Sequence, residues 1–132
     1  MSNVVFYFSG TGNCLKVAKT IVDKLGNGKI ISMAKHDKIT LNEQQDSIGF
    51  VYPVYFWGLP KKVIEFIENL NIANKENCYY YSIATHGGSP GNAVYQIYEL
   101  LLKRHNVKLN YGQKLHMFSN YVNYYDMKEK VS

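Results

Sequence analysis

The sequence predicts an α/β fold in which helices cover both faces of a parallel β-sheet, and two observations carry this prediction. Apolar segments and segments with helical spacing alternate along the 132 residues. The apolar segments are continuous rather than alternating with polar residues, as in strands that are buried on both faces. Right-handed crossovers between such strands favour a five-stranded sheet of order 2-1-3-4-5 within a three-layer sandwich.

Strands and helices are expected in regular succession. Apolar residues at helical spacing from Leu15 to Leu25 predict the first helix, and Pro60 marks the start of the second. The third helix is expected over residues 93–105, and residues 126–132 leave room for at most two short turns, so the last helix is expected to be short or missing. Strands are expected at residues 4–8, 29–33, 47–52 and 78–84, and a last strand with a break near Gly112 is expected within 107–118. Residues 34–46 are expected to form a loop with room for a helical turn. Residues 71–77 are expected to form a polar connection.

The loop between the first strand and the first helix has the composition of a phosphate-binding loop. Gly10 and Gly12 let the backbone close around an anion, and the first amides of the following helix lack internal partners. A dinucleotide fingerprint is incomplete, because Leu15 stands where the third glycine is required. The loop also lacks the Gly-Lys-Ser/Thr ending of a Walker loop. A compact loop around one terminal phosphate remains, and the alternative is a helix-capping turn without a ligand.

The run Ser9-Gly10-Thr11-Gly12-Asn13 resembles the Ser/Thr-Gly-Thr-Gly-Asn loop with which the flavodoxin family binds the phosphate of FMN. The first 120 residues resemble the flavodoxin-like domain of bacterial flavodoxin–ferredoxin fusion proteins. The cysteine cluster of a 4Fe–4S module is absent from the sequence, so no iron–sulfur chemistry and no metal is inferred. Cys14 replaces the family's usual threonine or serine. A thiol at a helix N-terminus can have a lowered pKa and be sensitive to oxidation, although passive replacement is the favoured interpretation.

Two further loops are expected at the same edge of the sheet, because ligands of open parallel sheets bind beyond the carboxyl ends of the strands. The resemblance implies that the second loop flanks the flavin ring and that the third surrounds its pyrimidine edge with amides. The predicted FMN-binding residues are Ser9, Gly10, Thr11, Gly12, Asn13 and Cys14 in the first loop, Pro53, Val54, Tyr55, Phe56, Trp57 and Gly58 in the second, and Thr85, His86, Gly87, Gly88, Gly91 and Asn92 in the third.

Particular roles follow from the resemblance. Trp57 is the favoured residue to stack on the ring and Tyr55 the second, whereas Phe56 could instead pack in the core. The Trp57-Gly58 peptide is expected to turn its carbonyl toward flavin N5 when that atom gains a proton, since glycine allows a positive φ. Thr85 could donate a hydrogen bond to the ring. His86 could couple protonation to reduction, or could simply be exposed to solvent.

Composition limits the other classes of function. The net charge of +5 comes from scattered lysines with one arginine, Arg104, so a solvated surface is favoured over a nucleic-acid site. No apolar run is long enough to span a membrane, and no signal peptide fits the start of the chain. Cys14 and Cys78 are expected to be reduced thiols of a cytoplasmic protein. Residues 1–132 are expected to form a single flavodoxin-like domain.

The leading hypothesis is an FMN-binding flavoprotein in electron transport, which shuttles low-potential electrons between redox partner proteins such as a ferredoxin-type protein or a reductase. Two alternatives stay open: an FMN-dependent NAD(P)H/quinone-type oxidoreductase, and a flavin-free interaction module with the same fold. No residue forms a convincing nucleophile or acid/base pair, so no catalytic residue is predicted. The molecule is expected to be a monomer or a weak dimer with no nucleic acid or membrane partner.

Overall fold

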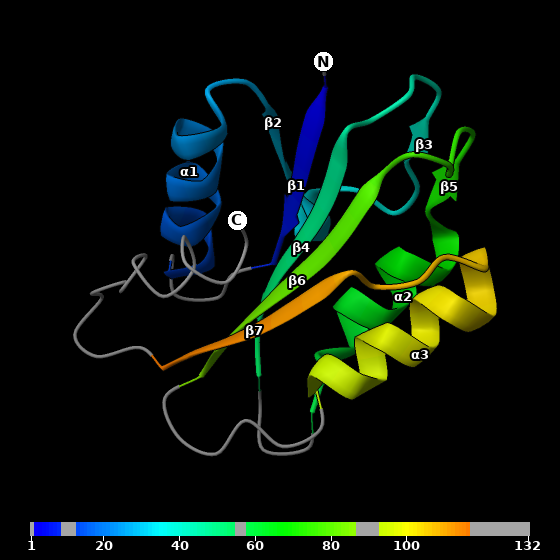
Figure 1. Cartoon of the computed structure of the whole chain (residues 1–132). Helices are drawn as coiled ribbons and strands as arrows, with labels where there is room; N and C mark the ends of the chain where they lie inside the picture. Colours follow the sequence, from blue (N-terminus) through cyan, green and yellow to red (C-terminus); the bar gives the residue numbers. More distant parts are fainter. Residues whose placement is uncertain (1, 9–12, 55–57, 87–92, 117–132) are drawn as a thin grey trace.

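The computed structural model describes residues 2–8, 13–54, 58–86 and 93–116, and the description below is limited to them (Figure 1). Seven strands, three α-helices and one short 3-10 helix occur in this part of the chain. They are β1 (Asn3–Tyr7), α1 (Asn13–Leu25), β2 (Lys29–Ser32), the 3-10 helix η1 (Met33–Lys35), β3 (Thr40–Leu41), β4 (Ser47–Pro53), α2 (Lys61–Asn69), β5 (Asn71–Ile72), β6 (Tyr79–His86), α3 (Ala93–His105) and β7 (Tyr111–His116).

Five of these strands form one sheet with the order β2-β1-β4-β6-β7, and every neighbouring pair is parallel. When only the strands of this sheet are counted, the order is the predicted 2-1-3-4-5. The register pairs Tyr7 with Val51 and Pro53 with Thr85, so β4 and β6 extend beyond the end of β1. The predicted fold class is therefore confirmed.

Helices cover the two faces of the sheet, with α1 on one side and α2 and α3 on the other (Figure 1). Successive residues of β1 alternate between these faces: Val5 packs with residues of α1, and Phe6 packs toward α2. The Phe6 and Phe66 rings lie 5.0 Å apart between centroids, and both side chains are fully buried. The helices bury one apolar face each because their apolar residues recur at helical spacing.

A second, two-stranded sheet was not predicted. β3 pairs in parallel with β5, although these stretches were expected as a loop and a polar connection. Each strand has two residues, which is too short for alternation in the sequence to reveal it. The expected break near Gly112 is also wrong, because β7 continues through Gly112, which pairs with Ser82.

The 3-10 helix η1 fills the helical turn for which room was expected after β2. The prediction for the last helix concerns residues 126–132, which lie outside the described part of the chain. Among the helices that the structure describes, none combines the length and the apolar character needed to cross a bilayer.

Candidate functional site

The candidate site lies at the carboxyl edge of the sheet, where three adjacent strands end and three helices begin (Figure 1). β1 leads into α1, β4 into α2 and β6 into α3. Two backbone hydrogen bonds continue the sheet at this edge: Phe8 N–H donates to Val51 O at 2.9 Å, and Val54 N–H donates to Thr85 O at 2.9 Å. The starts of the three predicted loops are therefore fixed next to one another.

The N-terminus of α1 provides an anion-binding feature at this edge. The helix begins at Asn13 and has no acidic residue in its first turn, and the exposed Lys16 adds a positive charge there. The first amides of a helix are free to donate hydrogen bonds, and the helix dipole favours a negative group near them. The end of the first loop thus suits a phosphate dianion.

Cys14 and Thr85 connect α1 to β6 through their side chains. The Cys14 thiol lies 3.3 Å from the Thr85 hydroxyl, and that hydroxyl donates to the backbone carbonyl of Tyr52 at 3.4 Å. Either group can donate in the first contact, and the neutral thiol donates when the Thr85 proton is directed to Tyr52. Both side chains are buried, with 2% of Cys14 and 4% of Thr85 exposed.

This burial overrides the effect of the helix N-terminus on the thiol. Burial raises the pKa of Cys14 to about 11, and the hydrogen bond to Thr85 offsets only part of the rise. The thiol is thus neutral at pH 7 and adds no negative charge to the phosphate region. A lowered pKa, one of the two interpretations of Cys14 in the sequence, is wrong, and the geometry favours passive replacement.

Gly58 adopts a backbone conformation that other residues rarely adopt, with φ of +113°. The next residue, Leu59, donates its backbone N–H to Oε1 of Gln96 at 3.0 Å. Gly58 and Leu59 are both buried, although they lie in the connection between β4 and α2. The positive φ expected at Gly58 is therefore present, and a residue of α3 contacts the same segment.

Gln96 was not among the predicted site residues. It stands in α3 beside the apolar Ile97, where a polar residue at the edge of an apolar face gives no distinctive signal. Its partner is 37 residues away along the chain, so the contact depends on how α3 packs against the second loop. The sequence shows only a glutamine one turn after a glycine-rich loop.

The structure places the described members of the predicted site at the same edge. These are Asn13, Cys14, Pro53, Val54, Gly58, Thr85 and His86, and the backbone of His86 pairs with His116. Their contacts with a cofactor stay predictions, as does a hydrogen bond from Thr85 to the flavin ring. The other predicted residues lie outside the described part of the chain: Ser9, Gly10, Thr11, Gly12, Tyr55, Phe56, Trp57, Gly87, Gly88, Gly91 and Asn92.

The helices α1 and α2 carry lysines in their first turns at this edge. None of the three helices that start there carries an acidic residue in its first turn, and Lys61 and Lys62 open α2. Lys62 forms an ion pair with Asp37 at 3.1 Å, whereas Lys61 is exposed. Within residues 2–8, 13–54, 58–86 and 93–116, no group of three His, Cys, Asp or Glu side chains could bind a metal ion. The donors present here fit an organic phosphate.

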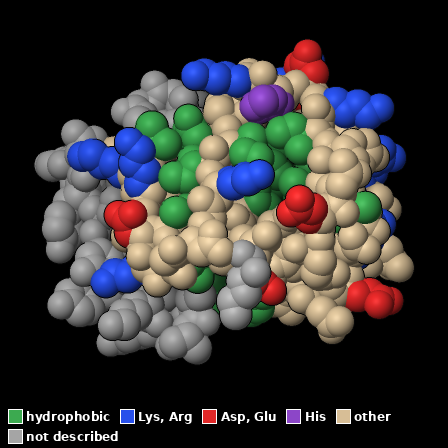
Figure 2. All heavy atoms as spheres, turned by 90° about the horizontal axis from the view of Figure 1, so that it is seen from above, with side chains coloured by type: hydrophobic (Ala, Val, Ile, Leu, Met, Phe, Trp, Pro, Cys, Tyr) green, Lys and Arg blue, Asp and Glu red, His purple; other side chains and the backbone are tan. Residues whose placement is uncertain are grey.

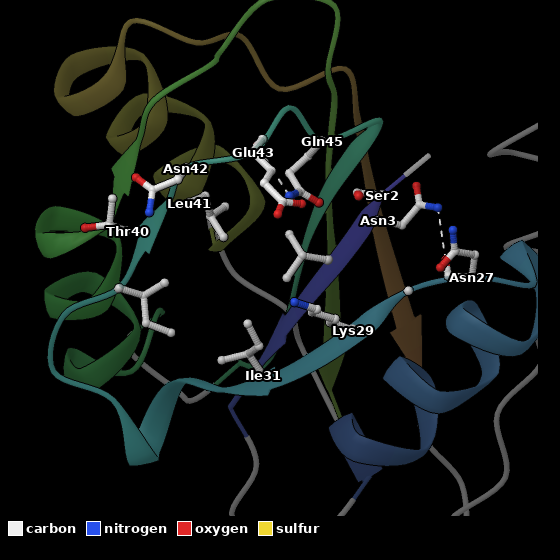
Figure 3. A pocket seen from close by; sticks show the side chains of 13 residues that line it. Ser2, Asn3, Asn27, Lys29, Ile31, Thr40, Leu41, Asn42, Glu43 and Gln45 are labelled. Carbon is white, nitrogen blue, oxygen red and sulfur yellow. Dashed lines mark hydrogen bonds between the residues drawn. The ribbon is translucent and has the colours of Figure 1, made fainter.

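A groove lies at the opposite, amino edge of the sheet, onto which Figure 2 looks. Its volume is about 550 Å³, and it lies between the starts of β1 and β2 and the segment 39–45 (Figure 3). Several of its polar groups bond within the protein: Asn3 Nδ2 donates to Asn27 O at 3.0 Å, and Gln45 Nε2 donates to Glu43 O at 3.4 Å. No predicted site residue lines the groove.

Comparisons with known proteins agree with this geometry. A family model described as a flavodoxin domain matches residues 4–122. A search of curated proteins gives no match. An oxidised flavodoxin 1 from Bacillus cereus is 17% identical, with a TM-score of 0.66 over 89% of this chain and 85% of its own.

Two other solved structures share the fold. A flavoprotein in complex with FMN from Lactobacillus acidophilus is 12% identical, with a TM-score of 0.65 over 99% of each chain. A flavone reductase is 9% identical, with a TM-score of 0.63 over 88% of this chain and 54% of its own. At these identities the likeness concerns the fold alone.

Proposed function

Because the chain belongs to the flavodoxin family, we propose that it binds FMN at the carboxyl edge of the sheet and transfers electrons between protein partners. The observation that carries this proposal is the convergence of the N-terminus of α1, the positive-φ Gly58 and the end of β6 at one edge. A phosphate and a flat ring need these features together, since one binds to helix amides and the other needs close approach of the backbone.

The residues at this edge have distinct roles in the proposal. The amides at the start of α1 bind the phosphate, and the neutral Cys14 thiol leaves this region free of a competing negative charge. Gly58 allows the second loop to approach the ring, and the buried Leu59 keeps water from the peptide that follows Gly58. FMN supplies one-electron and two-electron redox chemistry when it is bound. The protein contributes orientation and electrostatics.

The positive edge has a consequence for the reduction potentials. In the described residues, the starts of α1 and α2 place lysines near the edge, and none of the three helices that start there has a carboxylate in its first turn. Positive charge stabilises the additional negative charge of a reduced cofactor. We expect the second electron to be added more easily than in acidic flavodoxins, so the two midpoint potentials should lie close together. An anaerobic redox titration measures this separation, and a separation as wide as in acidic family members would contradict the expectation.

The proposed partners are redox proteins of the ferredoxin type or a reductase, with acidic surfaces matching the basic edge. The proposal includes a monomer or weak dimer in the cytoplasm with no nucleic acid and no membrane. An FMN-dependent NAD(P)H/quinone-type reductase is the second candidate, and the fold shared with a flavone reductase favours it. Steady turnover of NAD(P)H with a quinone by the FMN-loaded protein distinguishes the reductase from the carrier.

FMN binding itself is tested by comparing FMN with riboflavin, which lacks the phosphate. Asn13→Asp adds one negative charge at the start of α1, where aspartate is well tolerated by the helix. Repulsion of the phosphate should weaken FMN binding about tenfold, since a charge pair near a protein surface contributes on the order of 1 kcal/mol or more. Riboflavin binding should be unchanged.

Asn42→Asp is the matched control, because it makes the same charge change on an exposed residue of the amino-edge groove. Fluorescence titration of the unaltered protein and the two variants with each flavin gives the six dissociation constants that decide the question. If Asn13→Asp lowered the affinity for FMN and the affinity for riboflavin equally, the phosphate site would be contradicted. Failure of the unaltered protein to bind either flavin would favour the flavin-free interaction module.

A further inference from the structure

One side chain of α3 contacts the second loop at the position where a redox-responsive peptide is expected. Gln96, in the first turn of α3, accepts the backbone N–H of Leu59 through Oε1 at 3.0 Å. Leu59 is 4% exposed, so water is a poor substitute for this acceptor. Removal of the carboxamide would leave a buried N–H without its partner, which is costly.

The same carboxamide packs directly against Gly58. A Cβ atom on Gly58 would overlap Oε1 of Gln96 and would lie 3.1 Å from Cδ and 3.2 Å from Nε2. Gly58 also has φ of +113°. Two independent constraints therefore require glycine here: the backbone conformation, and the space that the Gln96 side chain occupies.

The contact between Gln96 and Leu59 joins the helix after the third loop of the candidate site to the second loop. The third loop, 87–92, leads directly into α3, and the second loop, 54–60, contains Gly58 and Leu59. One carboxamide thus connects the elements that carry two of the three loops. It binds the peptide between Gly58 and Leu59, which is next in sequence to the Trp57-Gly58 peptide.

We propose that Gln96 is a positioning residue, which binds the peptide after Gly58 and confines rotation to the peptide before it. This inference rests on the proposed FMN function. The bound Leu59 N–H fixes the peptide after Gly58 to α3, and Gly58, with its positive φ, is the residue that can rotate next to it. The free-energy difference between the two orientations expected of the peptide before Gly58, and hence the midpoint potentials, then depends on Gln96.

The sheet does not depend on this contact. β4 and β6 are joined by a register from Ser47–Tyr79 to Pro53–Thr85, and Val54 N–H binds Thr85 O separately. A variant at Gln96 should therefore fold, with its effect confined to the second loop. Gln96→Met has a similar length without an acceptor oxygen, and Gln96→Glu retains an acceptor oxygen.

The first measurement uses the flavin-free protein and follows hydrogen exchange at the Leu59 amide. We expect exchange about tenfold faster in Gln96→Met, as for the loss of one hydrogen bond, and close to the unaltered rate in Gln96→Glu. Unchanged protection of Leu59 in Gln96→Met would overturn the proposal. Because no flavin is present, this result is independent of the FMN function.

The second measurement is an anaerobic redox titration of the FMN-loaded proteins. We expect the separation of the two midpoint potentials to change in Gln96→Met, which adds no charge. Gln96→Glu serves only in the exchange measurement, because its added negative charge would itself make the second electron harder to add and so change the separation. Faster exchange at Leu59 with an unchanged separation would reduce Gln96 to a packing role and overturn the proposal. If the unaltered protein binds no FMN, the proposed function fails together with the redox role of Gln96, and the exchange result still decides whether Gln96 protects the Leu59 amide.

Discussion

The Cys14 thiol and the Thr85 hydroxyl share a hydrogen bond of 3.3 Å, and this contact joins the first turn of α1 to β6 at the candidate site. The hydroxyl in turn donates to Tyr52 O at 3.4 Å, so three elements share one line of hydrogen bonds. A thiolate could only accept from Thr85, and this hydrogen bond offsets part of the rise in the pKa of Cys14. Burial, which disfavours the thiolate, is the larger effect and keeps Cys14 protonated.

Ionisation of Cys14 should accordingly destabilise the fold at alkaline pH. The pKa of the thiol is about 11 in the folded protein, above the ordinary value of 9.0, because the side chain is buried. A group with a raised pKa contributes its full stability below the unfolded pKa and loses it as the pH rises through the folded pKa. The contribution of Cys14 should be complete below pH 9 and should decrease by about 2 kcal/mol by pH 11.

Denaturant unfolding of the protein and of Cys14→Ser between pH 7 and 11 measures this effect. Serine keeps a hydroxyl donor to Thr85 but does not titrate in this range, and Cys78 is present in both proteins. The difference in unfolding free energy between the two proteins should shift in favour of Cys14→Ser above pH 9. A difference that is constant over the whole range would show that Cys14 does not control alkaline stability.

Gly58→Ala should destabilise the protein more than the same change at another glycine with positive φ. Gly26 has φ of +76° with no atom within 4 Å of the point where a Cβ would lie, whereas Gly58 has φ of +113° and meets the Gln96 carboxamide. Gly26→Ala therefore measures backbone strain alone, at about 1 kcal/mol, and Gly58→Ala adds steric overlap of about 1 to 3 kcal/mol. Chemical denaturation of both variants gives the comparison.

A double variant separates the two contributions at Gly58. In a Gln96→Ser background the carboxamide is absent, so only the cost of the positive φ should remain for Gly58→Ala. The cost of Gly58→Ala should therefore be smaller by about 1 to 3 kcal/mol in this background than in the unaltered protein. An equal cost in the two backgrounds would attribute the requirement for glycine to the backbone conformation rather than to Gln96.

The sequence was informative where local pattern determines structure. Continuous apolar strands and helical spacing predict the main sheet and its order, and parallel topology predicts that the loops after Tyr7, Pro53 and His86 share an edge. The β3–β5 pair was missed because two residues per strand leave no pattern. These short strands pair through contacts between distant segments, which local propensity does not encode.

The two polar contacts at the site were not predictable for a related reason. The position of Cys14 at a helix start suggests a lowered pKa. Packing of α1 on the sheet buries the thiol, however, and this burial raises its pKa instead. The Gln96 contact depends on the packing of α3 beside the second loop. In both cases the decisive quantity is the distance between elements, which the sequence does not specify residue by residue.

His105 provides a prediction for acidic pH at the other end of α3. Its side chain is 6% exposed, and Nε2 donates to Ile67 O at 2.7 Å, near the C-terminus of α2. Burial lowers the pKa of His105, the carbonyl of Ile67 opposes this effect, and the charges of Lys75 and Arg104 lower the pKa further. The neutral ring is therefore favoured in the folded state.

A histidine with a lowered pKa contributes its stability above the unfolded pKa of 6.5 and loses it as the pH falls through that value. The denaturation midpoint should therefore decrease from pH 7 to pH 5 more steeply in the unaltered protein than in His105→Gln, which can still donate to Ile67 but does not titrate. Lys62→Gln is a control that removes an exposed ion pair with Asp37, and the denaturation midpoint of this variant should change with pH as steeply as that of the unaltered protein. If the denaturation midpoints of the unaltered protein and of His105→Gln changed with pH to the same extent, protonation of His105 would not limit acid stability.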